Sequence, residues 1–150
     1  MKFVTTLYNR AVALVSNPWM DQLTFIMVRV SLAGIFCRSG RTKVVEGSWL
    51  SISDTAKFLF QEEYKAVPLP PELAAYMATY AEHLFPILII LGLFTRLSAL
   101  ALLGMTMVIQ IFVYPEAWWS VHVIWVSLAL VLIVRGAGRF SIDTLLVKKT

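Results

Sequence analysis

Charged residues are scarce in this sequence. They make up 15% of its 150 residues, while 59% are hydrophobic, whereas soluble domains average roughly 25% charged and 45–50% apolar residues. A mean hydropathy of +0.75 leaves too few polar side chains to coat a globule in water. This shortage excludes a disordered chain and an ordinary soluble fold, and it predicts a protein embedded in the lipid bilayer.

Other absences exclude particular chemistries. Cys37 is the single cysteine, which excludes an internal disulfide and a CxxC redox or zinc motif. The chain has no GxSxG elbow and no P-loop, and Gly136-Ala137-Gly138 follows a membrane span where a dinucleotide fingerprint would need a strand. The formal charge of +4 forms no basic stripe. Anionic lipid head groups are therefore expected as partners, and nucleic acid is not.

Four hydrophobic segments are present that are long enough to cross a bilayer, which requires about 17 to 20 mostly apolar residues. They cover roughly residues 21–38, 73–94, 97–114 and 118–135. We therefore expect an all-α, integral membrane four-helix bundle, with residues 1–150 forming a single membrane domain.

Two interfacial helices are expected beside the spans. Near the N-terminus, apolar residues recur at helical spacing, which predicts an amphipathic helix on the membrane surface that ends at Asn17-Pro18. In the long connection 39–72, Ser51 and Asp54 have the spacing of a capping box before an apolar stripe. A short outer helix is therefore predicted in this connection.

Basic residues set the expected orientation. Four spans place both termini on one side, and the basic residues on that side are Lys2, Arg10, Arg96, Arg135, Arg139, Lys148 and Lys149. The opposite side has Arg38, Arg41, Lys43, Lys57 and Lys65. Seven against five predicts cytoplasmic termini by the positive-inside rule, in what we expect to be a bacterial inner membrane.

Two ionisable residues fall at membrane depth and need partners, because a charge inside a span is costly. If the outer ends of the first two spans lie level, Arg29 and Glu82 are at ~16 and ~15 Å depth, which predicts an ion pair between them. This pair either serves a ligand pathway or only fixes helix packing. Pro86 removes the hydrogen bond to the Glu82 carbonyl, which predicts a kink or an ordered water there.

A shallower polar layer is formed by Gln110 and His122, each ~6 to 7 Å from the outer ends of their spans. Together with Lys43 and Trp125, they are expected to border an outward pocket for an amphipathic ligand such as a quinone head group. The alternative is that Gln110 and His122 bond to each other or to backbone. A bis-histidine haem is not expected, because His83 and His122 differ in depth by about 10 Å, and no metal site is expected either.

Three groups of residues, spaced in order between about 25 and 143, resemble the DoxX family of small four-helix membrane proteins. They are Arg29-Val30-Ser31-Leu32-Ala33-Gly34 with Ser39-Gly40 and Lys43; Ala81-Glu82 with Leu91-Gly92-Leu93-Phe94-Thr95-Arg96; and Gly136-Ala137-Gly138-Arg139-Phe140-Ser141-Ile142-Asp143. The family pattern marks Arg29, Lys43, Glu82, Arg96, Ser141 and Asp143. The chain departs from it at Phe85-Pro86, where small residues are usual.

The resemblance implies an association with quinone-linked oxidation and membrane oxidoreductase complexes. The first hypothesis is a membrane subunit that binds a quinone-like or small redox ligand and works with a partner oxidoreductase subunit, which supplies the electron chemistry. Its ligand-binding residues would be Arg29, Lys43, Glu82, Gln110, His122 and Trp125. The second is a non-catalytic membrane anchor or assembly factor, and a transporter is disfavoured because no inverted repeat is present. The sequence leaves open whether the protein forms homo-oligomers.

The predicted orientation can be tested by cysteine labelling. In a Cys37-free background, Ser53→Cys should react with an impermeant thiol reagent in intact cells, because residues 39–72 are expected to face outward. Labelling that appears only after lysis would reverse the topology.

Overall fold

The computed structural model describes residues 2–147 and is built almost wholly of helices. In order they are α1 (Lys2–Val15), α2 (Pro18–Arg41), α3 (Asp54–Glu62), α4 (Pro71–Leu91), α5 (Thr95–Phe112), the 3-10 turn η1 (Pro115–Ala117), the π-helical turn η2 (Trp118–His122), α6 (Val123–Arg135) and α7 (Ile142–Val147). Four segments are long and apolar enough to cross a membrane: α2, α4, α5 and the continuous η1–α6 segment. The predicted all-α membrane bundle is confirmed.

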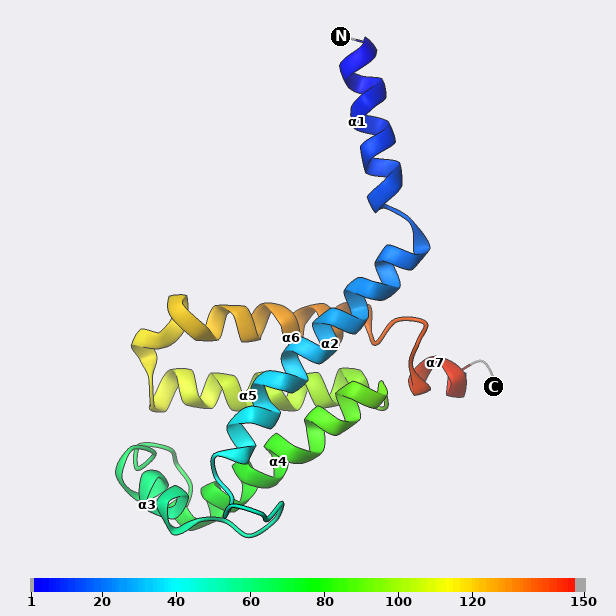
Figure 1. The fold of residues 1–150 in the computed structure, drawn as a ribbon. Coiled ribbons are helices and arrows are strands. Elements are labelled where there is room, and N and C mark those ends of the chain that lie inside the picture. The colour runs from blue at the N-terminus through cyan, green and yellow to red at the C-terminus, as the bar shows by residue number, and fades with distance from the viewer. Residues whose placement is uncertain (1, 148–150) are drawn as a thin grey trace.

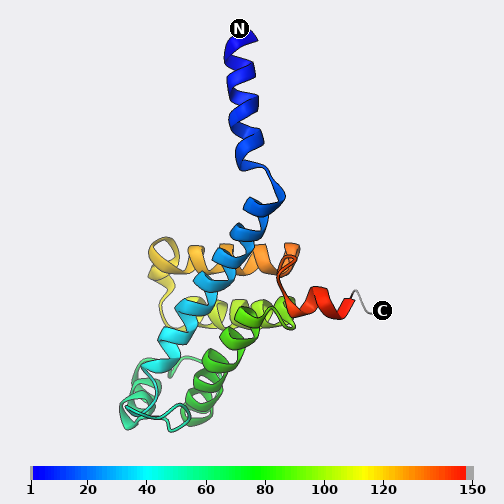
Figure 2. The same cartoon turned by 45° about the vertical axis from the view of Figure 1, so that its right-hand side comes forward.

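The four long helices form two antiparallel pairs, α2 with α4 and α5 with α6, which cross each other at an angle (Figure 1). Figure 2 shows the same crossing after a 45° turn. All four helices contribute to one fully buried apolar core, with Phe36 from α2, Ile89 from α4, Leu102 from α5 and Leu132 from α6. Large apolar side chains on the outer faces are exposed, as expected for helices surrounded by lipid.

Helix α1 stands apart from this bundle. It has no buried residue and projects away from the bundle at the start of α2 (Figure 1). The predicted boundary at Asn17-Pro18 is confirmed, because the Asn17 Oδ1 accepts the N–H groups of Trp19 at 3.0 Å and Met20 at 3.1 Å and so caps α2. That α1 lies on the membrane surface remains a prediction.

The predicted outer helix exists as α3, but the prediction of its capping residue was wrong. Ser53, not Ser51, caps α3, since its Oγ accepts the Ala56 N–H at 3.1 Å. The Ser51 carbonyl instead accepts the Val45 N–H at 2.8 Å, within the loop before α3. Because Ser53 holds a cap, Glu46, which is exposed in the same connection, is a matched second position for cysteine labelling.

The turn from α4 to α5 depends on a glycine and on a distant carboxylate. Gly92 ends α4 with φ +67°, and Phe94 has φ +48°. Asp143 bridges the turn, because its carboxylate accepts the N–H groups of Phe94 at 2.7 Å and Thr95 at 3.0 Å. Its own N–H donates to the Gly92 carbonyl at 2.8 Å. The segment after α6 is thereby fastened to the start of α5.

Gly92→Ala should destabilise the protein strongly. A Cβ on Gly92 would lie 2.5 Å from the Ser141 Cβ and 3.0 Å from the Arg29 Nη2, at a positive φ. We expect a loss of about 2 kcal/mol or more, measured as thermal unfolding in detergent. The matched control is Gly34→Ala, because a Cβ there meets nothing within 4 Å. Equal melting temperatures for the two variants would contradict the assigned role of Gly92.

Candidate functional site

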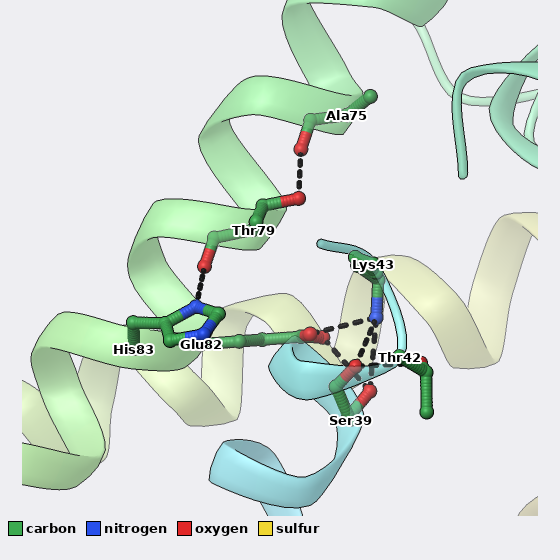
Figure 3. A network of polar contacts seen from close by, with 7 residues as sticks. All are labelled: Ser39, Thr42, Lys43, Ala75, Thr79, Glu82 and His83. Carbon is green, nitrogen blue, oxygen red and sulfur yellow. Dashed lines mark hydrogen bonds and ion pairs between the residues drawn. The ribbon is translucent and has the colours of Figure 1, made fainter. Parts of the chain in front are cut away.

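A buried ion pair joins the end of α2 to the middle of α4 (Figure 3). The Lys43 Nζ lies 2.6 Å from the Glu82 Oε2, and only 8% and 2% of the two side chains are exposed. Glu82 faces the bundle from α4, while Lys43 follows α2 in a turn held by its N–H, which donates to the Gly40 carbonyl at 3.0 Å. A loop residue therefore supplies the cation that neutralises a carboxylate within a membrane-spanning helix.

Ser39 completes a closed network around this pair. The Lys43 Nζ donates to the Ser39 Oγ at 2.9 Å, and that hydroxyl donates to the Glu82 Oε1 at 3.2 Å. A longer contact of 3.4 Å runs from Nζ to the Ser39 carbonyl. Both carboxylate oxygens and the ammonium are thus hydrogen-bonded, which is the condition for keeping two charges in an apolar interior.

The predicted Arg29–Glu82 ion pair was wrong. The buried Arg29 guanidinium instead donates to main-chain carbonyls, from Nε to Ile89 at 2.8 Å, from Nη2 to Ile90 and from Nη1 to Phe140 at 2.6 Å. The last-turn carbonyls of a helix carry no intrahelical partner and a partial negative charge. Arg29 is therefore stabilised by the end of α4 and the loop after α6.

The error came from the assumed register of α2 and α4. The prediction placed Gly40 level with Glu72. In the structure a Cβ on Gly40 would lie 2.9 Å from the His83 ring and 3.1 Å from the Glu82 Cβ, so Gly40 is level with Glu82. The difference of ten residues is ~15 Å of helix rise, which moves Glu82 away from Arg29 and beside Lys43.

A partly open cavity of about 280 Å³ adjoins the ion pair. Lys43 and Glu82 are the charged residues among its lining, which is otherwise apolar except for Tyr64. Small side chains on two facing helices make the space, Ala78 and Ala81 on α4 and Ala101 on α5. Such an apolar space with a few converging polar groups is the usual form of a small-molecule site.

Aromatic residues of the connection between α2 and α4 cover one side of the cavity. The Phe60 and Tyr64 rings stack at a centroid distance of 4.3 Å, and burial raises the pKa of Tyr64 above its usual range. The Tyr114 hydroxyl donates to the Glu63 carboxylate, and this bond raises the pKa of Tyr114 to about 12. The tyrosine just before η1 is thereby tied to the end of α3.

The other predicted ligand residues lie outside this cavity. His122 and Gln110 do meet, with 2.7 Å between Nδ1 and Oε1, and the Gln110 Nε2 donates to the Pro115 carbonyl at 2.7 Å. The Trp125 ring packs on His122 at 5.2 Å and on Phe36 at 5.3 Å. Of the six predicted residues, the structure brings Lys43 and Glu82 together at the cavity, groups Gln110, His122 and Trp125 elsewhere, and places Arg29 with the end of α4.

His83 is a further buried polar residue beside the pair. Its Nδ1 bonds the Thr79 carbonyl at 2.7 Å, and its Nε2 has no hydrogen-bond partner within residues 2–147. Among the same residues, no group of three histidine, cysteine or acidic side chains is placed to hold a metal ion. The chemistry offered by the site is therefore that of a lysine, a carboxylate and a neutral phenol facing an apolar space.

Sequence reasoning missed the lining of the cavity. Phe60 lies in the apolar stripe that predicts the outer helix, and Ala78 and Ala101 have no polar feature that marks them. The available signal was the row of small residues at helical spacing, Ala74, Ala78 and Ala81, on the face that also carries Glu82. The sequence does not show that this face borders a cavity, because that depends on how far α4 extends past the end of α2.

The fold and its buried charges define a small four-helix integral membrane protein. The DoxX family model matches residues 24–115, and the chain belongs to the DoxX family. The matched range includes Arg29, Lys43, Glu82 and Arg96. The chain is also 32% identical over 142 residues to an uncharacterized protein from Haemophilus influenzae, an alignment that covers 84% of this chain and 85% of that protein. No solved structure matches it.

A double-mutant cycle should detect the Lys43–Glu82 pair. Lys43→Met leaves a buried carboxylate without its cation, so we expect a loss of roughly 3 to 5 kcal/mol, and Lys43→Met/Glu82→Gln should lose less than the two single changes added together. Melting temperature and membrane yield measure the effect. The control cycle uses Arg29→Gln with Glu82→Gln, which should be additive because these side chains do not meet. Additivity in both cycles would refute the pair's coupling.

Proposed function

We propose that this DoxX-family protein is a membrane subunit of a quinone-linked oxidoreductase system, and that the cavity beside Lys43 and Glu82 binds the quinone head group. The supporting observation is an apolar cavity whose charged lining residues are one hydrogen-bonded ion pair. Family membership is consistent with this assignment. The predicted orientation would open this region toward the outer face of the membrane.

The size and lining of the cavity favour part of an amphipathic ligand. Its volume of about 280 Å³ is near the lower end of the roughly 300 to 1,000 Å³ of small-molecule pockets, so it suits a head group whose tail leaves between helices into lipid. Phe60, Tyr64 and Phe85 line the cavity, and aromatic side chains pack favourably against a flat conjugated group. Water-soluble anions would lack polar partners on most of this surface.

Lys43 and Glu82 have separate roles in this proposal. Lys43 donates a hydrogen bond to a quinone carbonyl oxygen, because its 3.4 Å contact with the Ser39 carbonyl is long and is the one most easily exchanged. The 2.6 Å contact with Glu82 stays in place. Glu82 can then accept or return a proton when the bound ligand changes redox state, while the electrons come from a partner oxidoreductase subunit.

A non-catalytic membrane anchor or assembly factor is the second candidate, and α1 favours it. The apolar residues Phe3, Leu7 and Leu14 on α1 are 80%, 60% and 76% exposed, away from the bundle. They are available to a client protein or to the lipid surface. This role requires no ligand in the cavity, so a ligand measurement separates the two candidates.

Quinone binding should raise the melting temperature of the purified protein. We expect stabilisation by decylubiquinone or a short-chain menaquinone that increases with concentration, as for any ligand selective for the folded state. Ala101→Leu, which fills the cavity, should weaken the effect about tenfold, and Glu82→Gln should also weaken it. The matched control Gly104→Val adds the same number of carbon atoms, three, to α5 at an exposed position where a Cβ meets nothing within 4 Å.

Two results would contradict the proposal. One is the absence of any shift in the wild-type protein with both quinone types, together with no quinone in the ultraviolet spectrum of its lipid extract. The other is a shift that Ala101→Leu leaves intact. His122→Ala should keep the shift in melting temperature, because His122 lies outside the cavity lining. Loss of the shift in this variant would instead place the quinone site at the Gln110 and His122 cluster.

A further inference from the structure

A second, more polar pocket lies at the opposite end of the bundle. It has a volume of about 710 Å³ and is lined where α2 and α5 begin, α6 ends and α7 follows. Three of its lining residues are arginines, Arg96 at the start of α5, Arg135 at the end of α6 and Arg139 in the loop beyond. The quinone proposal uses none of them.

The loop backbone brings two of these arginines to the same pocket. Gly136 and Gly138 have φ +78° and +80°, so the chain turns sharply between Arg135 and Arg139. Gly138 has no room for a larger residue, since a Cβ there would lie 2.9 Å from the Phe25 ring. The loop is held further by the Arg139 N–H, which donates to the Gln22 Oε1 at 2.6 Å. This backbone therefore places both arginines in the lining of one pocket.

Among the residues that the structure describes, the three guanidinium groups have no anionic partner. Within residues 2–147 none of them forms an ion pair, and no side-chain hydrogen bond of theirs occurs there. The Arg96 Nε lies 3.5 Å from the position of a Cβ on Gly136, against the loop, and Arg135 lies 5.8 Å from the centre of the Phe25 ring. All three side chains are exposed. Each guanidinium therefore keeps planar donors that no acceptor within residues 2–147 satisfies.

One acidic residue lines the same pocket, and it is already engaged. Both oxygens of Asp143 accept main-chain N–H groups, from Phe94 and Thr95. Its charge therefore balances the start of α5 rather than the arginines. Three guanidinium groups against one engaged carboxylate leave the pocket with a net positive charge.

Apolar side chains surround this positive charge. Phe94 and Leu97 are 61% and 63% exposed, and both line the pocket. Phe140 and Leu145, which are neighbours in sequence of residues that line the pocket, are also more than half exposed. Cations beside exposed apolar residues at the end of a membrane bundle match the boundary between lipid tails and head groups.

We propose that this pocket binds the phosphate group of an anionic phospholipid, with Arg96, Arg135 and Arg139 as the recognition residues. Guanidinium groups suit phosphate because their planar donors contact two oxygens at once. The acyl chains lie along Phe94 and Leu97, which distinguishes a lipid from free phosphate. Under the predicted orientation the site faces the cytoplasmic leaflet, where anionic lipids gather near basic residues.

The test is lipid titration of the purified full-length protein in detergent, followed by native mass spectrometry. Dioctanoyl phosphatidylglycerol should occupy one site more tightly than dioctanoyl phosphatidylcholine. Arg139→Gln should weaken that binding about fivefold, and Arg96→Gln/Arg139→Gln tenfold or more. Arg38→Gln is the matched control, because it removes an exposed arginine at the other end of α2 and should change the affinity less than twofold.

Three outcomes would overturn the assignment. Equal binding of the two lipids would remove the charge requirement, and equal losses in Arg38→Gln and Arg139→Gln would make the effect one of net charge. Inorganic phosphate that displaces the lipid at equal concentration would assign the site to a soluble anion. Arg139→Gln alters only an exposed side chain, so its melting temperature should match wild type, and its quinone response should be unchanged.

Discussion

A guanidinium inside a membrane protein must find hydrogen-bond acceptors, and the acceptors that Arg29 finds set the register of α2 against α4. Because these helices are antiparallel, bonds from Arg29 to the Ile89 and Ile90 carbonyls place Gly40 beside Glu82. The first three turns of α4 then extend past the end of α2. There α3 packs, with Phe60 against Ala74 and Ala75. Both the cavity and the nearness of Lys43 to Glu82 follow from this offset.

The parts of the structure that the sequence predicts are those decided by length, periodicity and composition. Hydrophobic runs located the four spans to within a few residues, and helix-capping chemistry located the break at Asn17-Pro18. Gln110 and His122 bond to each other, which the sequence offered as the alternative to a pocket shared with Lys43, and they meet because α5 and η2 are joined by a short turn. The partner of Glu82 could not be predicted from the sequence, because no local pattern reports how far α4 is shifted along α2. The prediction assumed that the ends of the two helices lie level.

The residues that the DoxX pattern marks divide between the two ends of the bundle. Lys43 and Glu82 form one group beside the apolar cavity. Arg29, Arg96, Ser141 and Asp143 belong to the other, where Asp143 caps α5 and the Ser141 Oγ donates to the Gly138 carbonyl at 2.7 Å. In the first group charge is neutralised within an apolar environment. In the second, Arg96 is exposed and has no ionic partner in the part of the chain that the structure describes, which favours an anion from outside the chain.

The buried charges of this protein differ in what they can do. Arg29 is satisfied by carbonyls of its own chain, and it lines neither the cavity beside Lys43 nor the arginine pocket, so its contacts account for it as a packing element. Stability accounts less well for Lys43 and Glu82, because apolar residues of similar volume often stabilise a protein as much as a buried ion pair does. This pair also lines a cavity. A group that enters the cavity meets a donor and an acceptor already held in place, which is the arrangement that ligand binding requires and packing does not.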